Sequence, residues 1–304
     1  MHFDLLDPTK GGTYMHLNFE VPDYKRVRVI LDTDCACEAD DPFAVAYALM
    51  SPKLIVKGII AEHFNEPGSM QASYDAIFKL TNAMHLNPNV LHGEEIPLCA
   101  ARPASEGVQF IIDEARREDD HPLYVLCLGA LSNIARALRE APDIAQKMTV
   151  VTIGGRDYFE PDQDIREFNF GNDIDAANAL LSSDVPVWQI PFCTYTAMRV
   201  GLAELQCRVA PCGDAGKYLF EQMVAYNLTP RAGWTAGESW ALGDSPAVGV
   251  VLHNNCGKQH RQQPLRVLPS TGYGEPLPAR DILVYDTIDS RYLMEDFYAK
   301  LSLL

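Results

Sequence analysis

Short runs rich in Val, Ile and Leu alternate with longer amphipathic segments from Val27 onward. Strands that alternate with helices build βαβ units, and such units give a mostly parallel sheet with helices on its faces. We therefore predict an α/β fold: a single Rossmann-like open, mostly parallel sheet flanked by helices. The predicted strands are 27–31, 54–61, 89–91, 123–128, 148–153, 185–191 and 282–285. The predicted helices are 42–50, 70–85, 105–117, 131–140, 174–182, 215–226, 246–252 and 291–301.

The chain is long enough to bury one large core, because it has 304 residues of which 47% are hydrophobic. We expect residues 1–26 to be an N-terminal extension and 27–304 to form one domain. Residues 230–245 are rich in Gly, Trp and polar side chains, which predicts a long loop. Long loops in compact domains are often functional.

The formal net charge of −16 argues against binding to nucleic acid or to an anionic membrane surface. The N-terminus has no signal-peptide pattern and no stretch approaches 18 consecutive apolar residues, so we expect a cytoplasmic protein. Most of the eight cysteines sit in apolar runs, and the pair Cys35 and Cys37 lacks the second pair that a zinc site needs. A small neutral or cationic ligand fits this composition best.

Five carboxylates crowd the ten residues 32–41, which we call the acidic loop. The loop follows the first predicted strand, and Pro42 then opens a helix. Like charges this close raise one another's pKa, so the loop is costly unless a cation or many donors compensate. Carboxylate and carbonyl oxygens are the ligands that Ca²⁺ and Mg²⁺ prefer, so the acidic loop predicts a site for a hard divalent cation.

Two other interpretations of the acidic loop remain open. Asp40 or Asp41 could cap the following helix while the other carboxylates face water. A phosphatase of the haloacid dehalogenase type also begins with D-x-D after a strand, but it needs Thr or Val at the position of Ala36. An EF-hand is excluded, because its glycine and its glutamate at the twelfth position are missing.

The run Ile30–Met50, ILDTDCACEADDPFAVAYALM, resembles the opening motif of the inosine-uridine preferring nucleoside hydrolases. It is most similar to the longer D-T-D-x-x-N-E-x-D-D form of one branch, with Cys37 where asparagine is usual. Later segments resemble the family in the same order: 126–133 (LCLGALSN), 151–155 (VTIGG), 167–169 (EFN) and 242–248 (LGDSPAV). The resemblance implies that 27–304 is a catalytic domain that cleaves N-ribosidic bonds of small ribosides with Ca²⁺, with Mg²⁺ as the alternative cation. It also implies a homodimer or homotetramer.

The resemblance assigns roles to individual residues. Asp34 would be the general base. Asp32 would support the acidic loop without being a metal ligand itself. The metal ligands would be Asp34, Asp41, the Leu128 carbonyl and Asp244. The ribose would be held by Asp40, Asn65, Glu167 and Asn169. Asp173 follows where the family often has another aspartate, although a helix cap is the plainer interpretation.

The leaving group is the part of the reaction that the resemblance does not explain. Many family members have a histidine before the last aspartate that protonates the base, but this chain has Gly243 there. Candidates on the base side are His63, Trp234, Glu238 and Trp240, with Tyr158 as a further possible acid. Because Cys37 and Gly243 depart from the family pattern, a ribosyl-binding protein that has kept the metal site and lost turnover is the main alternative.

Overall fold

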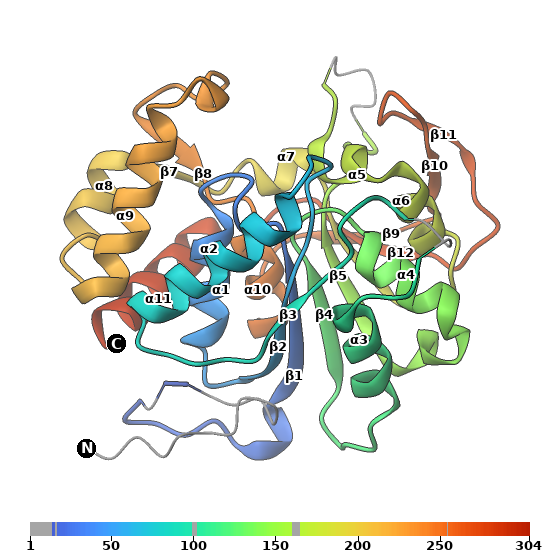
Figure 1. The fold of residues 1–304 in the computed structure, drawn as a ribbon, viewed down its shortest axis with the longest axis horizontal. Helices are drawn as coiled ribbons and strands as arrows, with labels where there is room; N and C mark the ends of the chain where they lie inside the picture. Colours follow the sequence, from blue (N-terminus) through green and yellow to red (C-terminus); the bar gives the residue numbers. More distant parts are fainter. Residues whose placement is uncertain (1–13, 16, 99–101, 160–164, 254) are drawn as a thin grey trace.

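The computed structural model describes residues 14–15, 17–98, 102–159, 165–253 and 255–304. Its centre is an eight-stranded sheet with the order β3-β2-β1-β4-β5-β6-β12-β9 (Figure 1). Seven strands are parallel to their neighbours, and the edge strand β9 is antiparallel to β12. The predicted open, mostly parallel sheet is confirmed. No helix in the described ranges is both long and apolar enough to cross a bilayer.

All seven predicted strands are present in the central sheet, within a few residues of the predicted ends. Their bounds are β1 (Val27–Thr33), β2 (Leu54–Ala61), β3 (Val90–His92), β4 (Leu123–Cys127), β5 (Thr149–Ile153), β6 (Val187–Ile190) and β12 (Ile282–Tyr285). In β1 the side chains of Val29 and Leu31 enter one hydrophobic core, and Ile30 enters the core on the opposite face. A strand that is buried on both faces needs apolar residues at successive positions, which explains the continuous run 29–31.

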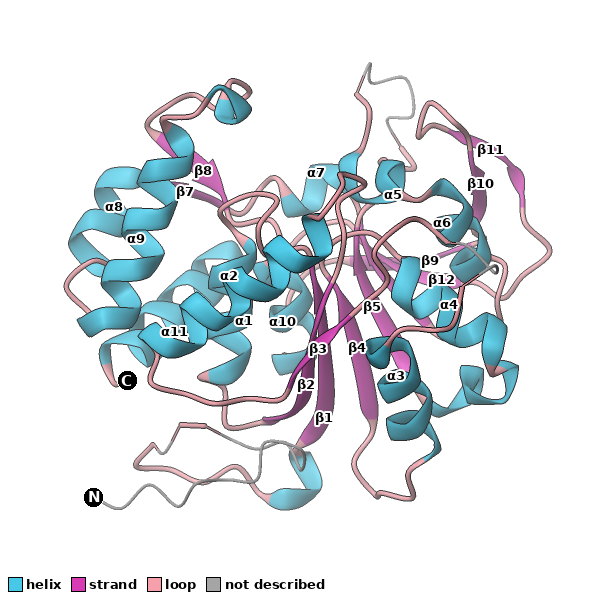
Figure 2. Ribbon diagram, in the orientation of Figure 1, coloured by secondary structure: helices cyan, strands magenta, loops and turns pink. Residues whose placement is uncertain are grey.

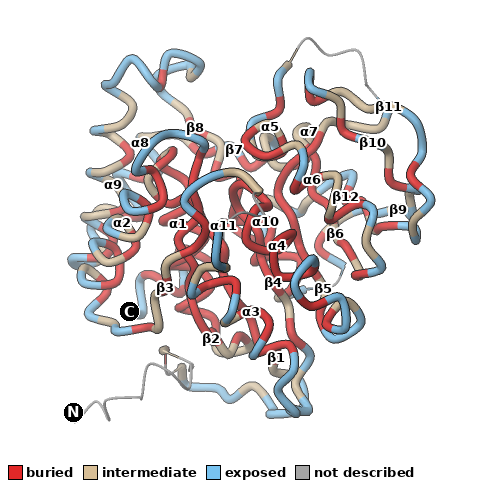
Figure 3. Tube along the Cα trace, turned by 45° about the vertical axis from the view of Figure 1, so that its right-hand side comes forward, coloured by how far each residue is buried: buried red, intermediate tan, exposed pale blue. Residues whose placement is uncertain are grey.

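Helices cover both faces of the sheet, and strands and inward helix sides are buried (Figures 2 and 3). One face carries α1 (Asp41–Leu49), α2 (Ser69–Ala83), α10 (Ser245–Leu252) and α11 (Ser290–Ser302). The opposite face carries α3 (Glu106–Arg116), α4 (Ser132–Glu140) and α6 (Ile174–Leu181). The helices α8 (Leu202–Arg208) and α9 (Gly213–Asn227) pack together, and α9 also packs against α2.

Several short elements were not predicted from the sequence. They are β9 (Gln259–Gln262), β10 (Leu265–Val267), β11 (Tyr273–Pro276), α5 (Phe168–Asn172), α7 (Phe192–Tyr195), α8, η2 (Asp23–Lys25), η3 (Pro142–Lys147) and η4 (Pro230–Ala232). The prediction of a continuous loop over 230–245 is wrong, because this segment contains η4 and the strand β8 (Ser239–Ala241). β8 pairs with β7 (Arg199–Gly201), and Trp240 lies opposite Val200. Three residues are too few to show a strand periodicity, and the partner strand is distant in the chain.

The strand order places a ligand crevice beside β1. The chain runs from β1 to β2 and β3 on one side, and then crosses to β4 on the other side of β1. Ligands of open α/β sheets bind at the carboxyl ends of the strands where the order reverses in this way. In this chain that point lies between Asp32-Thr33 at the end of β1 and Cys127 at the end of β4.

A buried amide supports the strand ends beneath this crevice. Asn133 Nδ2 donates to Asp32 Oδ1 and to Glu62 Oε2, each at 2.8 Å, and its Oδ1 accepts from Glu94 N at 2.7 Å. Asn133, Asp32 and Glu62 are fully buried. The amide therefore joins two carboxyl groups that have no access to water.

Replacing Asn133 with alanine is expected to lower the free energy of unfolding by about 2–3 kcal/mol, because buried acceptors lose their donor. Urea unfolding followed by circular dichroism measures this change. Asn87→Ala is the matched control, since Asn87 is exposed and its replacement should change stability by less than about 0.5 kcal/mol. Equal stability of the two variants would contradict a supporting role for the Asn133 amide.

Candidate active site

The acidic loop brings its carboxylates together at the carboxyl end of β1. Asp40 stands at the N-cap of α1 and Asp244 at the N-cap of α10, yet neither side chain bonds the first turn of its own helix. Asp40 Oδ2 instead accepts from Gly243 N at 2.9 Å, and Asp41 Oδ1 accepts from Thr33 Oγ1. The simple capping interpretation therefore does not describe the side chain of Asp40. Asp173, in contrast, is a true cap, because its Oδ1 accepts from Ala176 N at 2.9 Å.

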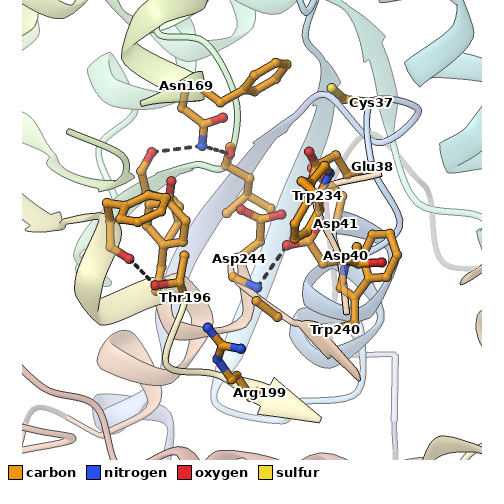
Figure 4. A pocket seen from close by; sticks show the side chains of 18 of the residues that line it. Cys37, Glu38, Asp40, Asp41, Asn169, Thr196, Arg199, Trp234, Trp240 and Asp244 are labelled. Atoms are coloured by element: carbon orange, nitrogen blue, oxygen red, sulfur yellow. Dashed lines mark hydrogen bonds between the residues drawn. The ribbon is translucent and has the colours of Figure 1, made fainter. Parts of the chain in front are cut away.

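Three carboxylates from distant segments form a group that could hold a cation. Carboxylate oxygens of Asp40, Asp41 and Asp244 lie within 4.8 Å of one another, and all three residues are buried. Figure 4 shows Asp40 and Asp41 beside Asp244 at the base of the pocket. A carboxylate-rich donor set of this kind suits Ca²⁺ or Mg²⁺.

The electrostatics of this group also favour a cation. Burial, followed by repulsion from neighbouring carboxylates, holds the pKa values of Asp34, Asp40 and Asp244 well above their usual range. Burial alone raises the pKa of Asp41 to about 6. Such shifts mean that the ionised forms of these carboxyl groups are unfavourable without a compensating positive charge. A divalent cation would supply the missing positive charge.

Asp34 lies against the turn that follows β4. A Cβ atom on Gly129 would stand 2.4 Å from Asp34 Oδ1, so only glycine allows the carboxylate to approach this turn. The preceding residue, Leu128, lines the same cavity, and its carbonyl accepts from Asn169 Nδ2 at 2.7 Å. A carbonyl oxygen has two lone pairs, so one remains for a further ligand.

Replacing Gly129 with alanine is expected to push the Asp34 carboxylate out of position and to destabilise the protein by about 1–3 kcal/mol. Thermal unfolding with and without Ca²⁺ measures both effects, and the stabilisation by Ca²⁺ should shrink. Gly201→Ala is the matched control for stability, because a Cβ there meets no atom closer than 3.9 Å. Unchanged Ca²⁺ stabilisation in Gly129→Ala would contradict the contact between Asp34 and this turn.

A cavity of about 540 Å³ opens above these carboxylates. Asp34, Asp40, Asp41, Leu128 and Asp244 line its floor, as the sequence predicts for one shared site. A volume in this range accommodates a small molecule with a sugar and a ring.

Of the predicted ribose and base residues, Asn169, Trp234 and Trp240 also line the cavity. Trp234 is 56% exposed, whereas Trp240 is only 2% exposed and packs edge to face on Trp234 with ring centroids 5.1 Å apart. Trp234 is therefore free to stack on a ligand, and Trp240 mainly supports it.

The remaining predicted ribose residues do not line the cavity. Glu167 is fully buried at the N-cap of α5, where it accepts from Asn169 N, Phe170 N and Tyr195 Oη. Asn65 is exposed and has a positive φ of 58°. Glu167 therefore positions the α5 turn that carries Asn169, and direct ribose contacts by Glu167 and Asn65 stay predictions.

The predicted acids on the base side also lie outside the lining of the cavity. His63 is fully buried; its Nδ1 accepts from Asn65 N at 3.0 Å, and its Nε2 lies 2.7 Å from Ser132 Oγ. Burial lowers the pKa of His63 to about 4, so its ring is neutral near pH 7. Glu238 is exposed, and Tyr158 donates to Gln189 Oε1 and stacks on Tyr273. A role for these residues in protonating the leaving group stays a prediction.

The structure adds lining residues to which the sequence analysis assigned no individual role. These are Glu38, Ile153, Ile165, Arg166, Phe168, Phe192, Tyr195, Thr196, Arg199, Thr235 and Ala241, among others. Burial, followed by the charge of Asp41, raises the pKa of Glu38 to about 7. Arg199 could not be found from the sequence, because it lies in the unpredicted strand β7 and no motif surrounds it.

Comparison with known proteins identifies the family. The model of the family "Inosine-uridine preferring nucleoside hydrolase" matches residues 29–280, which is most of the chain. An uncharacterised protein of Schizosaccharomyces pombe, C1683.06c, is 29% identical over 54% of this chain, and the match spans 61% of that relative's length. The pyrimidine-specific ribonucleoside hydrolase RihA of Escherichia coli O127:H6 is 25% identical over 73% of this chain and 76% of its own.

Solved structures agree on the fold. An inosine-guanosine nucleoside hydrolase superposes with a TM-score of 0.74 at 18% identity, covering 92% of this chain and 99% of that one. A purine-preferring ribonucleoside hydrolase from Gardnerella vaginalis superposes with a TM-score of 0.73 at 21% identity, covering 90% of this chain and 98% of that one. From the sheet, the acidic loop and the matched family model together, we conclude that the chain belongs to the inosine-uridine preferring nucleoside hydrolase family.

Proposed function

We propose that this protein hydrolyses the N-glycosidic bond of a ribonucleoside or a related small riboside. The reaction would use a divalent cation bound at the acidic loop, and Ca²⁺ is the first candidate. The observation that carries the proposal is the group of buried carboxylates of Asp34, Asp40, Asp41 and Asp244 on the floor of a cavity of about 540 Å³. Membership of the family supports the reaction class.

The donor set fits the cation. Asp34, Asp41, Asp244 and the Leu128 carbonyl would hold it, since all four line the cavity and offer only oxygen atoms. A bound Ca²⁺ supplies Lewis acidity toward the ribose hydroxyls and toward a water molecule.

The chain's own residues would then carry the reaction. Asp34 accepts a proton from the attacking water as general base. Asp40 and Asn169 orient the ribose, because an amide both donates and accepts while a carboxylate accepts from hydroxyls. The buried carboxylates favour the positive charge that develops on the sugar in an oxocarbenium-like transition state.

Release of reducing sugar from purine, pyrimidine and nicotinamide ribosides, with Ca²⁺ or with excess chelator, tests this function. Turnover with Ca²⁺ that disappears with chelator is the expected result. Binding of Ca²⁺ without any turnover would favour the alternative of a ribosyl-binding protein, which the departures at Cys37 and Gly243 motivate. Assembly into a homodimer or homotetramer stays a prediction, and sedimentation of the purified protein checks it.

A further inference from the structure

The cavity is rich in carboxylates, yet two arginines also stand among its described lining residues. The acidic lining residues in the described ranges are Asp34, Glu38, Asp40, Asp41 and Asp244. The arginines are Arg166 and Arg199. Arginines in such surroundings would be expected to neutralise the carboxylates through ion pairs. Neither guanidinium forms an ion pair with a carboxylate in the part of the chain that the structure describes.

The two arginines differ in what holds their side chains. The guanidinium of Arg166 is held by the backbone, because Nη1 donates to Pro269 O at 2.9 Å and Nη2 donates to Gly171 O at 3.0 Å. Arg199 is exposed, and its guanidinium makes no hydrogen bond with any residue in the described ranges. A guanidinium carries five N–H donors and no acceptor, and it keeps its charge at any ordinary pH. Arg199 therefore offers unused donors and a full positive charge at the cavity.

The pairing of β7 with β8, which we call the β7/β8 ribbon, decides which side chains of these strands share a face. Val200 and Trp240 lie opposite each other, are each 2% exposed and pack into the hydrophobic core. Successive side chains of a strand point to opposite faces, so their neighbours in each strand share the other face of the ribbon. That face carries Arg199, Ser239 and Ala241, and all three line the cavity.

Ser239 is a second free donor on the same face as Arg199. Its hydroxyl makes no hydrogen bond with any residue that the structure describes. Arg199 lies opposite Ala241, and Ser239 lies opposite Gly201. Arg199 and Ser239 are therefore diagonal neighbours, about 7–8 Å apart, which is a separation that a long side chain spans. The other two positions hold a glycine and an alanine, so no large side chain separates the two donors.

The free donors and the carboxylates occupy different parts of the cavity. In Figure 4 Arg199 lies on the opposite side of Asp244 from Asn169, the residue proposed to orient the ribose. The four ionised aspartates of the floor would outweigh the charge of one divalent cation, so the floor stays unfavourable for an anion. The cavity face of the β7/β8 ribbon instead attracts one. A ligand with its sugar over the floor and an acidic group beside the ribbon matches both regions.

We propose that Arg199 and Ser239 bind an acidic group of the substrate, so that the protein acts on ribosides that carry a carboxylate or a phosphate. This inference rests on the proposed hydrolysis and names the substrate class of that site. A guanidinium binds either group through two parallel N–H···O bonds, and the serine hydroxyl donates a third bond. Two sources supply this chemistry: a carboxylate on the leaving group, or a phosphate on C5′ of the ribose.

The test compares two pairs of ribosides whose members differ by one acidic group. Nicotinate riboside and nicotinamide riboside differ by a carboxylate on the leaving group. Uridine 5′-monophosphate and uridine differ by a phosphate on the ribose. The value of kcat/KM with Ca²⁺ is measured for all four in the wild type and in Arg199→Gln. For each pair, the ratio of the acidic to the neutral member in the wild type is divided by the same ratio in the variant, so that intrinsic reactivities cancel.

We expect this quotient to be about 10–150 in one of the two pairs, since the variant loses a hydrogen bond between charged groups. The pair that responds identifies the source of the acidic group. The loss should appear mainly in KM, because the acidic group binds away from the bond that breaks. Ser239→Ala should give a smaller quotient of about 3–10 in the same pair. Arg199→Lys should keep part of the discrimination, since lysine retains the charge but cannot form two parallel bonds.

A matched control and the neutral substrates separate this role from a structural one. Arg139→Gln removes another exposed arginine, in the last turn of α4 and outside the described cavity lining, and should leave all four rates unchanged. A quotient near 1 in both pairs, including equal losses on acidic and neutral members, would overturn the inference. Turnover of the neutral members would then leave the hydrolase proposal in place. A wild type that cleaves none of the four ribosides would overturn both.

Discussion

Replacing Asp34 with asparagine is expected to lower kcat/KM for riboside hydrolysis by at least about 10³-fold, because the change removes the proposed general base and one charged ligand of the cation. The same variant is expected to be more stable than the wild type when no metal is present. Asp34 is buried beside Asp41, and both burial and repulsion raise its pKa. A neutral amide of the same shape relieves that unfavourable charge.

Sugar-release kinetics and thermal unfolding in chelator measure the two effects on one protein preparation. Asp113→Asn is the matched control, because Asp113 is an exposed aspartate on α3 that accepts from Gln109. It should leave both activity and stability near wild type. If Asp34→Asn retained more than about a tenth of the wild-type rate, Asp34 would be neither the general base nor an essential ligand.

The second large effect is a dependence of stability on pH that Ca²⁺ should abolish. Free aspartates titrate near pH 3.9 in an unfolded chain. In the folded chain the pKa of Asp41 is raised to about 6, and the pKa values of Asp34, Asp40 and Asp244 are also held well above their usual range. Between pH 4 and these values the folded state binds more protons than the unfolded state. The metal-free protein should therefore lose stability as the pH rises, by about 1.4 kcal/mol per pH unit for each extra proton bound.

The stabilisation of the folded protein by Ca²⁺ should instead increase as the pH rises. Its ligands must be ionised, so its affinity rises with pH. Ca²⁺ at 100 times its Kd adds about 2.7 kcal/mol, and we expect a rise in Tm of about 4 °C at pH 7.5 and a smaller rise at pH 5. Thermal scans at both pH values with chelator, Ca²⁺ or Mg²⁺ measure this.

Asp41→Asn provides the control for the source of the pH effect. Because this variant lacks one carboxyl group with a raised pKa, the stability of the metal-free protein should fall less steeply with rising pH. Ca²⁺ should also stabilise the variant less than the wild type. If neither Ca²⁺ nor Mg²⁺ changed the Tm of the wild type at pH 7.5, the result would contradict a cation site at the acidic loop.

Most of the central sheet could be predicted because its strands are local and strongly patterned. The continuous apolar run 29–31 has one explanation, a strand buried on both faces, and residues 123–127 repeat that pattern. The β7/β8 ribbon could not be predicted, because its strands have three residues each and almost forty residues separate them. Their pairing depends on a partner that only tertiary structure supplies, and local propensity is too weak to indicate it.

The order of motifs along the chain indicates which residues are candidates for the metal site, but it does not indicate which of the candidates are accessible to a ligand. Asp34, Asp41, Leu128 and Asp244 lie at ends of strands or starts of helices that converge on one edge of the sheet. Chain direction and strand order therefore bring them together. Glu167 and His63 have the residue types expected for ribose and base, yet both are fully buried in hydrogen-bonded positions outside the cavity lining.

What the sequence by itself determined is the fold class and the acidic loop, because strand periodicity and a run of five carboxylates are local properties. What only the tertiary structure decided is which side chains face the ligand. Asp40 turns from its own helix toward Gly243, Gly129 lets Asp34 approach the β4 turn, and the β7/β8 ribbon presents Arg199 to the cavity. Each of these contacts joins segments that are distant in the chain, so long-range packing sets them and no local pattern encodes them.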